Sequence, residues 1–94
     1  MTKKERIYAT LFADFSPTTL IVEDESHLHH GHMGWNEKGE THMRVKIVTQ
    51  SFENESRLQR HRRINSSLAH YLKDGLHALA IEAHTPQEAK NQES

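Results

Sequence analysis

Histidine is the side chain with the most chemistry to offer in this sequence. Nine histidines occur among 94 residues, and cysteine is absent. The absence of thiols excludes disulfides, thiolate nucleophiles and all-thiolate metal sites. Neutral imidazole, by contrast, is a common ligand for borderline metals. Any metal chemistry of this chain must therefore use imidazole or carboxylate ligands, and the positions of the histidines decide where.

Four histidines gather in one polar segment. Residues 25–40 have no hydrophobic periodicity, and glycines are interleaved with polar groups, so a long loop is predicted. Loops longer than about 12 to 15 residues in compact domains are usually functional or disordered. A solvated loop and a metal-binding loop both stay open, and the density of imidazoles favours metal by a small margin. The four side chains are His27, His29, His30 and His32.

A further histidine, His77, falls at the start of an expected strand, where its side chain can emerge at the sheet edge. Taken alone, such a residue is more typical of a packed or hydrogen-bonded histidine than of a ligand. If the long loop folds back beside it, two imidazoles from separate segments could share one ion. A tetrahedral zinc site usually takes four ligands. The others would have to come from water, another loop histidine or a second protein.

Basic side chains cluster where a second helix is expected to begin. Runs of charge on helices are usually solvated faces, but a patch at a helix start can also hold phosphate or an acidic partner. Twelve basic and thirteen acidic side chains nearly cancel over the whole chain, so no overall positive field attracts nucleic acid. Any partner or nucleic-acid binding would depend on this local patch. It consists of Arg57, Arg60, His61, Arg62 and Arg63.

No catalytic residue can be assigned. The sequence has no Gly-x-Ser-x-Gly elbow, Walker loop or dinucleotide fingerprint, and it is short for a closed substrate cavity. A non-enzymatic role is therefore expected. No apolar stretch approaches the roughly 20 residues that span a bilayer, and the first residues lead into a helical pattern. We expect a soluble cytoplasmic protein with no membrane partner.

The elements that position these side chains begin with an amphipathic helix over residues 3–14. Thr2 and Glu5 have the spacing of a capping box, and Pro17 forbids continuation of the helix. Residues 18–24 are rich in β-branched and apolar side chains in alternation, which predicts a first strand.

A second strand and a long helix follow the loop. Residues 43–47 alternate apolar and basic side chains and are expected to return antiparallel to the first strand. Ser56 and Gln59 again have capping-box spacing, and an apolar stripe continues from there to Gly75, a predicted left-handed cap. The stripe consists of Leu58, Ile64, Leu68, Tyr71 and Leu72.

Residues 76–83 could be helical by propensity, but the segment is short and follows a helix stop, so a third strand is predicted. The polar tail from residue 85 is expected to be frayed or briefly helical. The order is helix, strand, strand, helix, strand, to which a short helical turn near Ser56 can be added. We therefore predict one α+β domain over residues 1–86, with helices on one face of a three-stranded mixed sheet, followed by a tail over 87–94.

Five short motifs, in order and at nearly the same spacing, resemble the BolA family over residues 5–86. One departure is Met43, which stands where an aromatic residue is common in that family. Each motif is short, but five in sequence make the resemblance highly specific. The motifs are Phe15-x-Pro17, Asp24-Glu25-Ser26, Glu40-Thr41-His42, Arg60-His61-Arg62 and His77-Ala78-Leu79-x-Ile81.

The resemblance implies an α-β-β-α-α-β order similar to a type II KH domain. It also implies a monothiol glutaredoxin as partner, in iron-sulfur trafficking or iron homeostasis. A 2Fe-2S cluster would be shared between the two proteins, with thiolates from the glutaredoxin and its glutathione and with histidine from this chain. His77 matches the C-terminal histidine ligand of the family. For the second ligand the resemblance leaves His29 and His32 open.

Two alternatives remain from the sequence. Some BolA-like proteins act in transcription regulation, and residues 57–63 could contact DNA. RNA binding of the KH kind is disfavoured, because no Gly-x-x-Gly stands between the later helices. The second alternative is a stand-alone histidine metal binder. Without a partner, the chain is expected to be a monomer or a weak homodimer.

Overall fold

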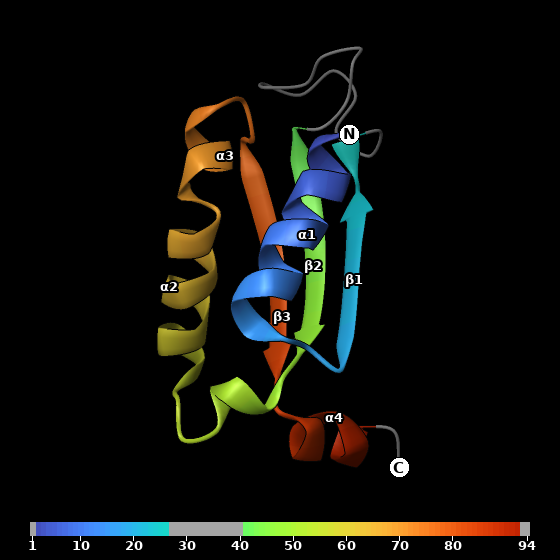
Figure 1. Ribbon diagram of the computed structural model, residues 1–94, viewed down its shortest axis with the longest axis vertical. Helices are drawn as coiled ribbons and strands as arrows, with labels where there is room; N and C mark the ends of the chain where they lie inside the picture. The colour runs from blue at the N-terminus through green and yellow to red at the C-terminus, as the bar shows by residue number, and fades with distance from the viewer. Residues whose placement is uncertain (1, 27–40, 93–94) are drawn as a thin grey trace.

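The computed structural model describes residues 2–26 and 41–92. A three-stranded sheet carries two of the helices on one face, so that the described residues form two layers (Figure 1). None of the helices in the described ranges is both long and apolar enough to cross a membrane. The elements are α1 (Lys3–Phe15), β1 (Thr19–Asp24), β2 (His42–Val48), the 3-10 helix η2 (Gln50–Phe52), α2 (Arg57–Ser67), α3 (Ala69–Lys73), β3 (Ala78–His84) and α4 (Pro86–Gln92).

The sheet is mixed, as predicted. Its strand order is β1-β2-β3, with β1 antiparallel to β2 and β3 parallel to β2. The parallel pairing follows from the helical connection through α2 and α3, which returns the chain to the end of the sheet where β2 begins. As a result the end of β1 and the starts of β2 and β3 lie at one end of the sheet (Figure 1).

The core lies between the sheet and the helices. The side chains that the two layers share are all buried. This burial orders α1 and α2 against the strands, because an amphipathic helix gains most of its stability from packing its apolar face. The principal members are Ile7, Leu11, Phe15, Val22, Met43, Val45, Ile47, Phe52, Ile64 and Leu68.

Both predicted capping boxes are present. The side chain of Thr2 accepts from the Glu5 N–H while Glu5 accepts from the Thr2 N–H. Ser56 and Gln59 make the same reciprocal pair at the start of α2. Gly75 has the positive φ of 95° that a left-handed cap requires.

The prediction of one long helix, which was based on the apolar stripe, is wrong in two respects. The chain leaves helical geometry at Leu68, with φ −103° and ψ 11°, so that α2 and α3 are separate helices. The αα order implied by the family resemblance is thereby confirmed. Leu58 is 59% exposed, because the inward position one turn before Ile64 belongs to Arg60.

The ends of two further elements differ from the sequence prediction. The short helical turn lies at η2, ahead of Ser56, where the Thr49 side chain accepts from the Ser51 N–H. The third strand begins at Ala78, so that His77 precedes it. The tail is briefly helical in α4. The division of the chain at residue 86 stays a prediction.

Candidate functional site

Three predicted motifs meet at the end of the sheet where the segment 27–40 leaves and re-enters the described structure. Asp24 ends β1 opposite Met43, and His42 begins β2 opposite Ala78 of β3. His77 directly precedes Ala78. Residues separated by more than fifty positions in sequence are therefore neighbours here, at the upper end of the sheet in Figure 1.

A hydrogen-bond network ties the two ends of that segment together. Asp24 Oδ1 accepts from both the backbone N–H of Ser26, at 2.9 Å, and its hydroxyl, at 2.5 Å. The Ser26 hydroxyl oxygen in turn accepts from the backbone N–H of Thr41, at 2.9 Å, and of His42, at 3.2 Å. Ser26, Thr41 and His42 are all buried. Ser26 and Thr41, which flank the segment 27–40, are therefore bonded directly to each other.

The same network fixes the backbone of His77. The Thr41 carbonyl accepts from the N–H of His77, at 2.8 Å, and from that of Ala78, at 3.2 Å. The His77 side chain is exposed. An exposed imidazole on a rigid backbone, next to the ends of a histidine-rich segment, has the placement that a metal ligand at a protein surface needs.

Sequence reasoning used His42 as part of a motif and did not consider it as a member of the site. Its ring is 8% exposed, and its centroid lies 6.4 Å from the ring centroid of His77. Its Nδ1 lies 2.8 Å from the Thr41 hydroxyl oxygen. One feature of the sequence could have identified it. His42 lies between the histidine-rich segment and the predicted strand 43–47.

The other predicted metal ligands, His29 and His32, lie outside the described residues, as do His27 and His30. Within residues 2–26 and 41–92, no three side chains of the metal-ligating types gather closely enough to hold an ion. The described part of the chain by itself therefore supplies an incomplete donor set.

The basic patch divides into internal and exposed side chains. Arg60 is 8% exposed, and its guanidinium donates to both oxygens of Glu88, at 2.5 and 3.0 Å. It also donates to the carbonyls of Glu55, at 3.1 Å, and Ala83, at 3.2 Å. The hydrogen bonds from Arg60 lower the pKa of Glu88 to about 2, and those to Glu88 raise the pKa of Arg60.

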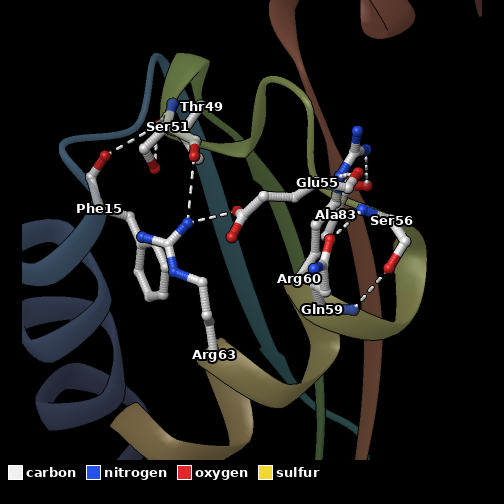
Figure 2. Close-up of polar contacts among 9 residues, drawn as sticks. All are labelled: Phe15, Thr49, Ser51, Glu55, Ser56, Gln59, Arg60, Arg63 and Ala83. Atoms are coloured by element: carbon white, nitrogen blue, oxygen red, sulfur yellow. Dashed lines mark hydrogen bonds and ion pairs between the residues drawn. The ribbon is translucent and has the colours of Figure 1, made fainter.

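Arg63 is likewise engaged inside the chain, as Figure 2 shows. Its guanidinium is paired with the Glu55 carboxylate and donates to the Ser51 carbonyl at 3.1 Å. It also lies 5.0 Å from the ring centroid of Phe15 and 5.6 Å from that of Phe52. Arg60 and Arg63 therefore hold α2 to the turn before it and to the C-terminal helix.

The remaining members of the patch face outward. Arg57 and Arg62 are exposed, and His61 is half-buried. Burial, and then the nearby Arg57 charge, lower the pKa of His61. Arg57 and His61 also line a cavity of about 340 Å³ with Glu82 and His84 between α2, β3 and α4. The charges of this cavity are mixed, and it shows no preference for an anion.

Comparisons with known proteins identify the family of this chain. The family model described as BolA-like protein matches residues 11–88. A Sinorhizobium protein described as an uncharacterized protein in the cobS 5' region is 47% identical over 89 residues, which cover 94% of this chain and 96% of that protein. The protein named DNA-binding transcriptional regulator BolA of Haemophilus influenzae is 42% identical, over 84% of this chain and 73% of its own length.

A solved structure gives the same result for the fold. The BolA domain of SufE1 from Arabidopsis thaliana superposes with a TM-score of 0.85 at 42% identity, over 94% of this chain and 96% of that one. The residues that the BolA-like family model matches include Ser26 and His77 of the hydrogen-bond network and Arg60 of the basic patch. This chain belongs to the BolA-like family.

Proposed function

We propose that this protein is a non-enzymatic partner of a monothiol glutaredoxin and shares a 2Fe-2S cluster with it through histidine ligands. The observation that carries the proposal is the exposed imidazole of His77 on a backbone fixed by Thr41, at the point where both ends of the histidine-rich segment are anchored. We further propose that the pair acts in the cytoplasm, in iron-sulfur cluster trafficking or in iron regulation.

The donor set of the chain fits a shared cluster better than a cluster of its own. Cysteine is absent, so thiolates have to come from a glutaredoxin and its glutathione. Imidazole ligands lower the negative charge of such a cluster and raise its reduction potential. His77 is exposed and can meet a ligand held by a second protein. The residues of this chain then bind and orient the cluster at the interface.

The second ligand is proposed to be His29 or His32. His29 follows the anchored Ser26 by three residues, so covalent geometry limits its distance from that residue to about 10 Å. His32 follows by six residues, which allows about 20 Å. Ser26 and His77 both bond to Thr41. The distance limits for His29 and His32 therefore start from a residue that lies close to His77.

The test is the visible absorption and circular dichroism of this protein mixed anaerobically with a cluster-loaded monothiol glutaredoxin. The wild type is expected to produce a new spectrum that His77→Ala alters. His70→Ala is the matched control, because His70 is also exposed and lies on the neighbouring α3. His29→Ala and His32→Ala then identify the second ligand. An unchanged spectrum with His77→Ala, or no complex with the wild type, would refute the proposal.

A second candidate function is DNA binding. Relatives at 42% and 41% identity are named DNA-binding transcriptional regulators, and two arginines of α2 are exposed. The observations for this candidate are weaker, because Arg60 and Arg63 have partners within the chain. We propose it as an additional activity that uses Arg57 and Arg62.

A further inference from the structure

Beside His77 lies a second imidazole to which the proposed function gives no role. The buried ring of His42 and the exposed ring of His77 have centroids 6.4 Å apart, and their planes differ by 28°. His42 is the first residue of β2, and the backbone of its neighbour Thr41 holds that of His77. The exposed ring is therefore bordered by a ring whose place is set by the sheet.

The tautomer of His42 follows from a count of protons and lone pairs. The Asp24 carboxylate only accepts, so the Ser26 hydroxyl donates to it. The Ser26 oxygen then accepts from the N–H groups of Thr41 and His42, which occupy both of its lone pairs. The Thr41 hydroxyl oxygen lies 3.3 Å from Ser26 Oγ but only 2.8 Å from His42 Nδ1. The Thr41 hydroxyl has one proton for these two atoms, and the shorter distance together with the occupied lone pairs of Ser26 favours Nδ1 as its acceptor. The proton of a neutral His42 is then on Nε2.

We infer that His42 is a positioning residue for His77, held in one orientation and one tautomer by the hydrogen bonds of Asp24, Ser26 and Thr41. The inference rests on the proposed role of His77 as a ligand. An exposed imidazole loses rotamer freedom when it binds, and a fixed neighbouring ring removes part of that freedom beforehand. Loss of the groups that orient a histidine ligand typically reduces metal affinity by about 10- to 100-fold.

One substitution separates the ring contact from the rest of the network. Thr41→Val keeps the β-branched shape, and it keeps the backbone N–H that bonds Ser26 and the carbonyl that accepts from His77. It removes the hydroxyl that bonds His42 Nδ1 at 2.8 Å and Ser26 Oγ at 3.3 Å. The Ser26 oxygen keeps its two backbone N–H donors in this variant, so the closest contact to be lost is the one to the His42 ring.

Thr49→Val is the matched control. Thr49 follows the last residue of β2, at the other end of that strand, is as buried as Thr41, and donates its hydroxyl proton to the Phe15 carbonyl at 2.8 Å. Both variants lose the hydrogen bonds of one buried hydroxyl, so similar decreases of the melting temperature are expected. Among the described residues, the Thr49 hydroxyl bonds Phe15 and Ser51, which lie outside the network of His42 and His77.

Two measurements test the inference. Nitrogen-15 NMR of the protein alone should show wild-type His42 protonated on Nε2, and Thr41→Val should change the shifts of that ring. Three-bond couplings should report a single χ1 rotamer of His77 in the wild type and in Thr49→Val, and averaged rotamers in Thr41→Val. In the complex with cluster-loaded glutaredoxin, Thr41→Val should lose the cluster about tenfold faster than Thr49→Val.

The outcomes separate this inference from the proposed function. Equal His77 couplings and equal cluster loss in Thr41→Val and Thr49→Val would overturn the positioning role. Protonation of His42 on Nδ1 would overturn the assigned direction of the hydrogen bonds, and the inference with it. If His77→Ala leaves the spectrum of the complex unchanged, the proposed function fails, while the couplings of the protein alone still decide whether His42 orders His77.

Discussion

At the scale of single residues, Arg60 shows how a charge can be part of a core. Positions 60, 64 and 68 follow one another at single helical turns, and all three are buried. Removing a guanidinium from water is costly unless it is paired and its donors are satisfied. Glu88 supplies two acceptors, and the carbonyls of Glu55 and Ala83 supply two more. Arg60 thereby links α2, β3 and α4.

Glu88→Gln should make stability less dependent on pH. The folded pKa of Glu88 is about 2, below its ordinary value of 4.5, so its ion pair stabilises the fold fully above pH 4.5. That contribution is lost as the pH falls from 4.5 toward 2. Because the carboxylate is 44% exposed, we expect Glu88→Gln to cost only about 1 kcal/mol at pH 7, and less at pH 3. Urea unfolding at both pH values measures the difference.

Glu23→Gln is the control for this prediction, because Glu23 is an exposed carboxylate of β1 far along the chain from Arg60. It should change stability little at either pH. If Glu88→Gln and Glu23→Gln have the same stability at pH 7, the ion pair of Arg60 contributes nothing measurable.

At the scale of elements, α2 is defined by its ends more than by its apolar content. The Ser56 side chain accepts from the Gln59 N–H at 3.1 Å, and the Gln59 side chain accepts from the Ser56 N–H at 2.7 Å (Figure 2). Ile64 and Arg60 are the only buried side chains of the helix. With so small a buried face, the cap and the arginine contacts take a larger share in fixing where the helix begins.

Ser56→Ala should therefore destabilise the protein by about 1 kcal/mol, since it removes the acceptor for a backbone N–H at the helix start. Ser66→Ala, at an exposed position inside the same helix, should be neutral or slightly stabilising. Chemical unfolding of both variants measures the contrast. Equal unfolding free energies for the two would show that the capping box contributes no stability.

The sheet has one apolar and one charged face. On the face away from α1 and α2, Glu23 is opposite Arg44, and Lys46 is opposite Glu82. Arg44 also bonds Glu25, at 3.1 Å, and this hydrogen bond is the main cause of its raised pKa. Charges of alternating sign keep this face solvated. The two-layer architecture needs no second helical layer on this side.

At the scale of the whole molecule, charge limits any interaction with DNA. The formal net charge is −1, and two of the four arginines of the basic patch are used internally. If DNA binds through Arg57 and Arg62, about two phosphate contacts are involved, and the logarithm of the affinity should fall with that of the salt concentration with a slope of about −2. The double variant Arg57→Gln/Arg62→Gln should remove this dependence in fluorescence anisotropy titrations with a duplex.

A double variant of α1, Lys4→Gln/Arg6→Gln, is the matched control, because it removes the same charge from exposed side chains of another helix. It should leave the salt slope unchanged. Equal loss of affinity in both double variants would mean that binding responds to overall charge alone, and it would count against a DNA site on α2.

The sequence by itself determined the type and order of the principal elements. The caps at Thr2 and Ser56, the break at Pro17 and the left-handed residue Gly75 are local features, because each depends on hydrogen bonds or dihedral angles within a few residues. The alternation of side chains along β1 and β2 is also a local feature, and it predicted both strands. The motifs also identified the family, which the comparisons confirm.

Only the tertiary structure decided which distant residues meet. The sequence placed Arg60 in a basic patch that could bind a partner or nucleic acid, but α4 brings Glu88, 28 residues further along the chain, into an ion pair with it. In the sequence, His42 was only the last residue of a family motif ahead of the predicted strand 43–47, and the parallel pairing of β2 and β3 places it next to His77. Spacing along the chain cannot predict such contacts, because they depend on how the segments pack. They also depend on which buried polar groups require hydrogen-bond partners to offset the cost of burial.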